Sequence, residues 1–266
     1  AAPAWTGRMS APTRIATWNV NSLNVRLPHL LQWLGEDGVD IVAIQETKLT
    51  DDRFPVVALQ EAGWHCAWHG QKTYNGVALV SREPISDVVT GIPGFDDTQA
   101  RVIAGTIGDI RTLCVYVPNG QAVGSDKYAY KLEWLAALRD YVVNILAEHP
   151  NLVVSGDFNI APTEADTHDP DRWEGHILCS DAERAALQAL LDTGLTDAFT
   201  RIDPPEQRFT WWDYRQGGFR RGLGLRIDHH LISEPLLQRF DSFAIDIEPR
   251  RWERPSDHTP VVCGLR

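Results

Sequence analysis

Short apolar segments of this chain end repeatedly on carboxylate, amide or histidine side chains, and this pattern limits the possible folds more than any other feature. The junctions lie at Trp18–Asn21, Ile44–Lys48, Ser155–Asn159, Ile227–His230 and Ser256–Thr259. Polar groups at strand ends can converge on one rim of a sheet, where a rigid scaffold holds them. A single acidic strand end is usually a turn residue, but five in one chain favour a shared site.

The hydrophobic periodicity predicts more strands than helices. Strands are expected at Arg14–Trp18, Asp40–Gln45, Gly76–Val80, Val102–Ile107, Arg111–Val117, Leu152–Ser155, Phe209–Trp212, Arg226–Ile232, Ser242–Ile247 and Pro260–Gly264. Helices are expected at Pro28–Gly35, Pro55–Ala62, Tyr128–His149 and Ala182–Leu191. Because several strands adjoin without a helix between them, the pattern favours packed mixed sheets with helices outside over a doubly wound parallel sheet.

The chain is expected to form one domain over residues 11–266. Residues 1–10 show no recognisable pattern, and Met9, the only methionine, lies near the end of this range. These residues are therefore expected to be a disordered arm or an expression remnant. No apolar run approaches the ~20 residues of a membrane span. The four cysteines are far apart and form no CxxC pair, which is typical of reduced thiols in a cytoplasmic protein.

The net charge is −11, from 25 basic and 36 acidic residues, which argues against indiscriminate binding of polyanions. The segment Gln207–Arg226 reverses this balance, with five arginines against the single acid Asp213, and it contains several aromatic residues. Basic residues interleaved with aromatics suit a phosphate backbone and exposed bases. A solvated loop whose aromatics return to the core explains the composition equally well. Arg250, Arg251 and Arg254 form a second basic patch.

The side chains at the strand ends have the chemistry of a magnesium site. Asn, Asp and Glu supply hard oxygen ligands, the set that suits Mg²⁺ or Mn²⁺. An Asp-His pair beside such a metal can polarise a phosphoryl oxygen, and an Asp with an Asn two residues later can hold the attacking water. The chain contains no HExxH, GxxxxGK[ST] or GxSxG motif, which weakens the zinc-protease, P-loop and serine-hydrolase alternatives.

Six motifs follow one another along the chain in a recognisable order. They are Trp18-Asn19-Val20-Asn21, Ile44-Gln45-Glu46-Thr47-Lys48, Tyr116-Val117-Pro118-Asn119-Gly120, Gly156-Asp157-Phe158-Asn159-Ile160, Gly224-Leu225-Arg226-Ile227-Asp228 and Pro255-Ser256-Asp257-His258. In this order they resemble the exonuclease III family of bacterial abasic-site (AP) endonucleases, within the endonuclease/exonuclease/phosphatase superfamily. The resemblance spans about residues 14–265.

The resemblance implies a DNase I-like α/β fold, in which two mixed sheets pack face to face in a four-layer sandwich flanked by helices. It also implies a Mg²⁺-dependent DNA repair nuclease, with Mn²⁺ as a possible substitute. Such an enzyme would hydrolyse the phosphodiester 5′ to abasic sites, trim DNA 3′ ends, or do both. The substrate would be double-stranded DNA with abasic sites or 3′ ends, and the protein is expected to be a monomer that does not bind membranes.

The same resemblance assigns roles to individual residues. Glu46 would be the main metal ligand, with Asn19 and Asp257 nearby. Catalytic roles would fall to residues that align water, contact the scissile phosphate or orient other groups: Tyr116, Asp157, Asn159, Asp228, Asp257 and His258. In particular, Asp257 would orient His258. Substrate contacts would come from Asn119, Tyr74 and Arg226, and the sugar pocket would be lined by Trp211, Leu225 and Ile227.

Two features depart from the family pattern. His229 and His230 follow Asp228, where apolar residues are more usual, and we interpret them as hydrogen-bonded structural histidines rather than a second metal site. The long acidic segment Thr163–Asp181 is expected to be a loop that borders the pocket, where bulk could shift the balance between abasic-site and 3′-end activities. The alternatives are a superfamily phosphodiesterase acting on phospholipids or inositol phosphates, and a DNA-binding relative without catalytic activity.

Overall fold

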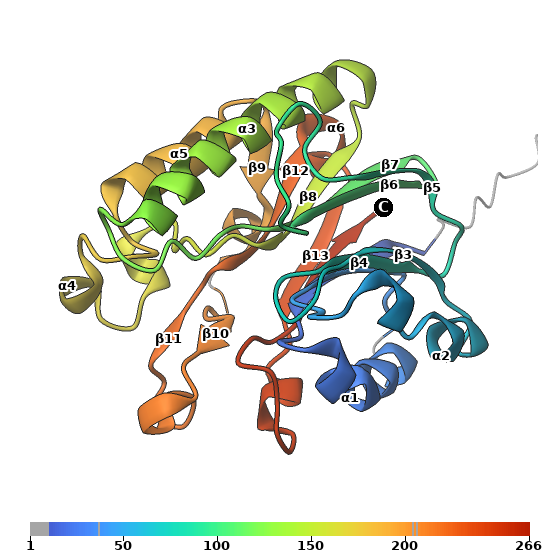
Figure 1. Cartoon of the computed structure of the whole chain (residues 1–266), viewed down its shortest axis with the longest axis horizontal. Coiled ribbons are helices and arrows are strands. Elements are labelled where there is room, and N and C mark those ends of the chain that lie inside the picture. Colours follow the sequence, from blue (N-terminus) through green and yellow to red (C-terminus); the bar gives the residue numbers. More distant parts are fainter. Residues whose placement is uncertain (1–10, 37, 204, 206) are drawn as a thin grey trace, which may run out of the picture.

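The computed structural model describes residues 11–36, 38–203, 205 and 207–266, and within them two six-stranded mixed sheets pack face to face (Figure 1). The first sheet contains, in spatial order, β13 (Phe240–Ile245), β14 (Val261–Leu265), β1 (Thr13–Asn19), β2 (Ile41–Gln45), β4 (Val77–Ser81) and β3 (His65–His69). The second contains β5 (Ser86–Thr90), β6 (Val102–Ile107), β7 (Ile110–Tyr116), β8 (Leu152–Asp157), β12 (Asp228–Ser233) and β9 (Leu195–Asp197).

Helices cover the outer faces of both sheets, which confirms the expected four-layer α/β sandwich (Figure 1). The helices α1 (Leu23–Glu36) and α2 (Val56–Glu61) lie on the first sheet, and α3 (Asp126–Glu148) and α5 (Asp181–Leu191) lie on the second. A small ribbon of β10 (Trp211–Trp212) and β11 (Gly224–Leu225) stands apart from the sheets, and the short helices are α4 (Pro170–Trp173) and α6 (Glu234–Leu237).

Side chains alternate between the two faces of each strand, so the same strands contribute to the apolar layer between the sheets and to the two apolar layers beneath the helices. On β1, Ile15 faces the second sheet and packs with Val153 and Ile232. Its neighbours Ala16 and Trp18 face the opposite way and pack beneath α1, where Trp18 meets Trp33 edge to face with ring centroids 5.6 Å apart. Because successive strand residues point to opposite faces, the nearly continuous apolar run of this strand is buried on both sides.

Helix α1 begins five residues earlier than the predicted start at Pro28. Proline favours the first turn of a helix because it lacks a backbone N–H, and this preference misplaced the predicted boundary. Pro28 instead lies inside the helix, whose apolar face is anchored by Leu23, Leu30 and Trp33. Burial of that face against the first sheet outweighs the hydrogen bond lost at Pro28.

Four strands were not predicted because their sequences are short or polar, among them the two-residue β11 (Gly224–Leu225). β3 reads His-Cys-Ala-Trp-His, β5 is an exposed edge strand and β9 has only three residues. The segment Thr163–Asp181 is also more ordered than the predicted loop, since it contains a 3₁₀ turn at Glu164–Asp166 and the helix α4. The predicted arm over residues 1–10 lies outside the described residues. No helix in the described part of the chain is long and apolar enough to cross a membrane.

Candidate active site

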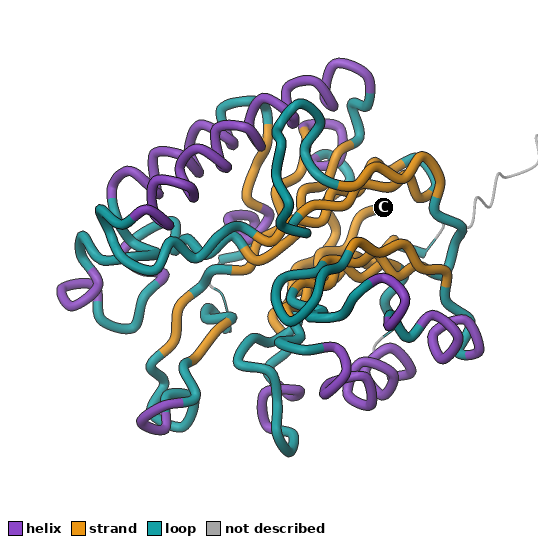
Figure 2. Tube along the Cα trace, in the orientation of Figure 1, coloured by secondary structure: helices purple, strands orange, loops and turns teal. Residues whose placement is uncertain are grey.

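Strand pairing brings the polar strand ends to one edge of the sandwich, as predicted from their positions in the sequence. β1 and β2 are parallel, so Asn19 lies opposite Gln45 and next to the residue that follows it, Glu46. In the other sheet β7 and β8 are parallel with Tyr116 opposite Asp157, and antiparallel β12 begins with Asp228 opposite the same aspartate. The strands of both sheets continue from this edge into long loops (Figure 2).

Two of the site residues have backbone conformations that non-glycine residues rarely adopt. Glu46 has φ +54° and Asn159 has φ +48°, both in the left-handed region. Each stands within two residues of a strand end, and the backbone N–H of Asn159 turns back to donate to Asp157 at 3.0 Å. Strained residues of this kind persist only where the surrounding structure holds them, and they are concentrated at functional sites.

Asn19 holds two acidic residues together at the centre of the site. Its side-chain Nδ2 donates to a carboxylate oxygen of Glu46 and to one of Asp157, at 2.9 Å each. Its Oδ1 accepts the backbone N–H of Asn21, also at 2.9 Å. In this geometry the amide N–H of Asn19 faces the carboxylates, and its role as a metal ligand stays a prediction.

Tyr116 is a hydrogen-bond donor fixed against Glu46. Its hydroxyl donates to a Glu46 carboxylate oxygen at 2.8 Å. Burial, and then the negative charges of Glu46 and Asp157, hold the pKa of Tyr116 well above its ordinary value. The phenol therefore stays protonated at neutral pH and can donate to a negatively charged group in the site, as its predicted catalytic role requires.

His258 is oriented by Asp228, and the predicted orientation by its neighbour Asp257 is wrong. Nδ1 of His258 lies 2.9 Å from one Asp228 carboxylate oxygen and 3.1 Å from the other. Nε2 lies 3.5 Å from an oxygen of Asp157, on the cavity side. The Asp257 carboxylate instead accepts from Nε1 of Trp211 at 3.0 Å and from Asn21 at 3.3 Å.

The electrostatic environment shifts the pKa values of Asp157 and His258, and the two shifts suit different roles. Burial raises the pKa of Asp157 to about 7, with His258 opposing the shift and Asp228 adding to it. Burial alone would lower the pKa of His258, but Asp228 and then Asp157 outweigh it and raise this pKa to about 10. A carboxyl group poised near neutrality suits a general base, and a histidine that stays cationic suits a developing negative charge.

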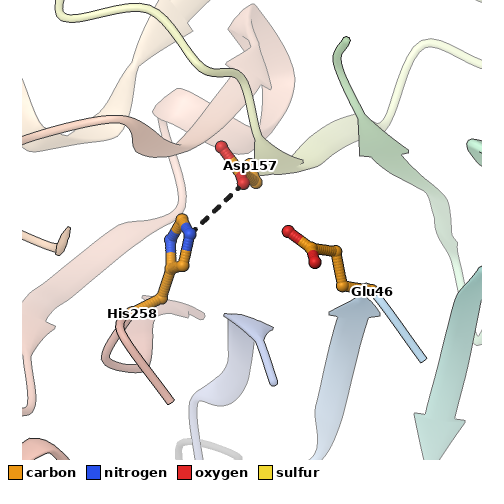
Figure 3. Close-up of side chains that lie close together, drawn as sticks. All are labelled: Glu46, Asp157 and His258. Atoms are coloured by element: carbon orange, nitrogen blue, oxygen red, sulfur yellow. Dashed lines mark ion pairs between the residues drawn. The ribbon is translucent and has the colours of Figure 1, made fainter. Parts of the chain in front are cut away.

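Glu46, Asp157 and His258 could together face a divalent cation (Figure 3). One ligand atom from each lies within 4.8 Å of the others. Among them the carboxylates of Glu46 and Asp157 are the hard oxygen donors that Mg²⁺ or Mn²⁺ prefers, whereas the raised pKa of His258 favours its protonated form. The residues present fit such an ion through Glu46 and Asp157. Asp257 lies outside this group.

The carboxylates open into a cavity of about 300 Å³ that has an aromatic and aliphatic wall. Trp211 and Ile227 line it, as expected, together with Asn119 and Asn159. The segment Thr163–Asp181 contributes Trp173, Ile177 and Leu178 to the same wall. Leu225 was expected there too, but it is fully buried in the cluster behind Ile227 and does not line the cavity.

Arg226 is a structural residue rather than the expected DNA contact. Its guanidinium is almost fully buried and donates to Asp166 and to Asp197, each at 2.8 Å, and it stacks over the ring of Phe199. This network ties β12 to the Asp166 turn that leads into the cavity wall. The basic segment Gln207–Arg226 is therefore partly internal, and Arg215 is the arginine of this segment that lines the cavity.

A second, larger cavity of about 730 Å³ adjoins the first and shares Tyr116 and Asn119 with it. Tyr74, which was expected to contact substrate, lines this cavity with its side chain 67% exposed. Arg101 and Lys127 also line it. The shared residues make the two cavities neighbours, and the larger one has positive side chains in its lining.

His229 and His230 are buried structural residues, as interpreted from the sequence. His229 contacts the carbonyl of Ile160 and Arg226, and His230 contacts Ser155 and the carbonyl of Val261. Burial lowers the pKa of both, to about 4 for His230. They point to opposite faces of β12, so they cannot form one metal site.

Sequence reasoning gave no role to Lys48, although it ends the motif Ile44–Lys48. Its ammonium lies 3.5 Å from a Glu46 carboxylate oxygen and donates to Asn21 at 2.7 Å. Lys48 also has a left-handed backbone conformation, with φ +56°, two residues after the strained Glu46. The signal that could have found it is its position in the motif, two residues after the candidate metal ligand.

A four-layer sandwich with an acidic site that contains tyrosine and histidine at its strand ends has the arrangement of a hydrolase that acts on phosphate esters. The family model of the endonuclease/exonuclease/phosphatase family matches residues 16–258, and the chain therefore belongs to this family. Exodeoxyribonuclease III of Haemophilus influenzae is 33% identical and aligns with 95% of this chain and 100% of its own length. In keeping with this, the protein is a nuclease.

Two solved structures extend the comparison. The 3′ phosphatase NExo from Neisseria, bound to a product DNA hairpin, superimposes with a TM-score of 0.94 at 49% identity and covers 96% of this chain and 99% of its own. An AP endonuclease from Archaeoglobus fulgidus gives a TM-score of 0.91 at 37% identity, with 95% and 99% coverage. The chain is similar over nearly its whole length to enzymes of two related activities.

Proposed function

We propose that this protein is a Mg²⁺-dependent DNA repair nuclease that hydrolyses phosphate esters at DNA 3′ ends. The observation that carries the proposal is the meeting of Glu46, Asp157 and His258 in one cavity beside the phenol of Tyr116, with Asp228 buried behind His258. The likeness to a 3′ phosphatase bound to DNA supports this substrate class. Mn²⁺ is expected to substitute for Mg²⁺, because both prefer oxygen ligands.

The site residues divide the work of a phosphodiester hydrolysis. Water attacks phosphorus, the bond to the leaving oxygen breaks, and the products are a hydroxyl end and a phosphate. Asp157 takes the proton of the attacking water, because its buried carboxylate faces the cavity between Asn19 and His258. Asn159, whose backbone N–H donates to Asp157, would help to hold this water.

Positive and donating groups stabilise the charge that develops on the phosphate. His258, held by Asp228, presents Nε2–H to a non-bridging oxygen. Tyr116 and Asn119 line the same cavity and are placed to contact other phosphate oxygens. A divalent ion held by Glu46 would neutralise the phosphate and stabilise the leaving oxygen.

Cleavage 5′ to abasic sites is the second candidate activity. It is favoured by the cavity wall of Trp211 and Ile227, which could enclose a sugar that has no base. The similarity to an AP endonuclease supports it as well. Trp173 and Leu178 occupy part of the same wall, so we expect 3′-end hydrolysis to be the faster of the two reactions.

One assay tests these activities against the alternatives. End-labelled duplex DNA with a single abasic analogue, and matched duplexes with a recessed 3′ end or a 3′ phosphate, are incubated with Mg²⁺ or with chelator. We expect Mg²⁺-dependent loss of 3′ nucleotides or phosphate, and slower internal cleavage. Binding without turnover would favour an inactive DNA-binding relative. Turnover of inositol phosphates or phospholipids, without DNA cleavage, would favour the other alternative.

We further propose that residues 11–266 act as one domain, as a monomer and in the cytoplasm. The two sheets share buried layers in which Ile15 and Ile41 meet Val153 and Ile232, which supports one folding unit. The cysteines Cys66, Cys114, Cys179 and Cys263 are all free, which fits a reducing compartment. We expect light scattering of the purified protein to give the mass of a monomer. We also expect the protein to unfold reversibly in a single transition.

A further inference from the structure

A fully buried lysine connects the two loops that bring Asn119 and Asn159 into the active site. Lys131 lies on α3, and its side chain is completely enclosed. Its ammonium donates to the backbone carbonyl of Asn159 at 2.7 Å and to that of Asn119 at 3.1 Å. It also forms an ion pair with Glu183, whose side chain is fully buried as well. Lysine is almost never fully buried unless it is paired, so the site is built around this group.

The sheet alone does not determine how these two loops lie relative to each other. The parallel pairing of β7 with β8 ends with Tyr116 opposite Asp157. Asn119 and Asn159 come two or three residues later, where the ladder has ended. α3 is the crossover that joins β7 to β8, so its residue Lys131 can reach both departing loops. Where the ladder of strand hydrogen bonds has ended, the ammonium of Lys131 donates to both loops and connects them.

The loops are also shaped to lie against the lysine. Gly120 has φ +89°, and a Cβ at this position would lie 3.0 Å from Cδ of Lys131. Asn159 has φ +48°, and its side-chain amide donates to the carbonyl of Val117 at 2.9 Å, which closes the contact between the loops. The turn after Asn119 therefore packs directly on the lysine stem.

Glu183 extends the connection to the third segment that lines the cavity. Its carboxylate accepts the backbone N–H of Leu178 at 3.0 Å and the hydroxyl of Ser180 at 2.8 Å. Leu178 lines the active-site cavity. Ser180 also contacts the hydroxyl of Tyr128 on α3, at 2.7 Å, and so joins α5 to α3.

We propose that Lys131 is a positioning residue of the active site, which sets Asn119 on the phosphate side at a defined distance from Asn159 on the water side. It touches neither substrate nor reacting atoms, and acts through the backbone carbonyls of these two residues. The inference rests on the proposed DNA hydrolysis. The competing explanation is that the Lys131–Glu183 pair only stabilises the packing of α3 against α5.

Three variants separate positioning from stability. Lys131→Met removes the ammonium but leaves Glu183 as an unpaired buried charge. Lys131→Met/Glu183→Gln removes both charges, and replacing both members of a buried pair is often neutral for stability; this variant carries the test if the single variant does not fold. Ser180→Ala is the control, because it breaks the α5 cap, the Tyr128 contact and one hydrogen bond to Glu183 but leaves the Glu183 ion pair and both carbonyl contacts of Lys131 in place.

We expect the double variant to melt close to the wild type yet to hydrolyse a 3′-end substrate with kcat lower by about 10- to 100-fold, because small displacements of aligned groups cost rates of this order. KM should change by less than about threefold, since the groups that bind the rest of the DNA are untouched. Ser180→Ala should melt at lower temperature and keep the wild-type kcat.

Hydrogen exchange supplies a readout that does not depend on activity. Deuterium uptake in peptides covering residues 117–121 and 158–161 should rise in the double variant and stay unchanged in Ser180→Ala. A wild-type kcat in the double variant would overturn the proposal, and so would an equal loss of kcat in Ser180→Ala. If the wild-type protein itself leaves DNA intact, the proposed function fails, while the exchange data still decide whether Lys131 holds both loops.

Discussion

Nδ1 of His258 lies 2.9 Å from a carboxylate oxygen of Asp228, a residue that precedes it by 30 positions in the chain. The adjacent Asp257 faces Trp211 instead. The histidine is thus held from the second sheet, across the interface between the sheets, rather than by its own loop. This arrangement keeps Nε2 turned toward Asp157 and the cavity.

Asp228→Asn is expected to lower kcat by about 10²–10⁴-fold, as in other enzymes whose catalytic histidine loses its carboxylate partner. The raised pKa of about 10 keeps His258 cationic across the neutral range in the wild type. Without the Asp228 charge this pKa falls, so activity should begin to decline at lower pH in the variant. A pH profile of kcat measures both effects. Asp257→Asn is the matched control, and equal losses in the two variants would contradict the assignment.

Glu46→Gln should reduce Mg²⁺-dependent cleavage at least about a hundredfold, because the proposed ion loses its charged ligand. Glutamine retains an oxygen to accept from Tyr116, so the melting temperature should stay near that of the wild type. DNA affinity measured in chelator should be unchanged or tighter, since one negative charge near the phosphate is gone. Efficient cleavage at ordinary Mg²⁺ concentration would show that Glu46 is not a ligand.

Trp211→Ala should reduce cleavage at abasic sites more than hydrolysis at 3′ ends. A flat aromatic wall can pack against an extruded sugar that has no base, whereas binding of a frayed 3′ end depends less on the shape of this wall. Trp211→Phe is the control, because it keeps a flat ring but loses the N–H that donates to Asp257. The measurement is the ratio of the two kcat/KM values, and an unchanged ratio in Trp211→Ala would assign the residue to the core.

Arg226→Met should destabilise the fold by about 3–5 kcal/mol, since it leaves the buried carboxylates of Asp166 and Asp197 without their shared partner. Arg215→Met removes an exposed ion pair with Asp213 and should change the free energy of unfolding by less than about 1 kcal/mol. Urea unfolding compares the two. A DNA-contacting Arg226 would give the reverse pattern, with lost affinity and little lost stability.

His230 should make the protein less stable as the pH falls below neutrality. Its pKa is lowered from 6.5 to about 4 by burial, so between these values the unfolded chain binds a proton that the folded chain does not. Its share of the stability is complete above pH 6.5 and is lost as the pH falls toward 4, with a slope of at most about 1.4 kcal/mol per pH unit. His230→Gln should flatten that part of a stability-against-pH curve; an identical slope would exclude His230 as its source.

Periodicity and residue chemistry were sufficient to predict the sandwich and most of its central strands. Runs such as Ile41–Gln45 and Leu152–Asp157 are apolar enough to be recognised without a partner. The strands His65–His69 and Leu195–Asp197 were not, because their pairing partners decide their conformation more than their own side chains do. The start of α1 was likewise decided by burial rather than by Pro28.

For the site, the sequence by itself predicted which polar residues gather at the strand ends, because polar groups that interrupt buried strands are costly unless they are used. It could not determine which of these residues contact one another. Arg226 lies in a strong motif yet is turned inward to Asp166, and the partner of His258 is Asp228 rather than Asp257. Lys131 stood within a predicted helix as one charged residue among several. These roles depend on distances between segments far apart in the chain, and only the packed sheets and the crossover helix bring such segments within hydrogen-bonding range.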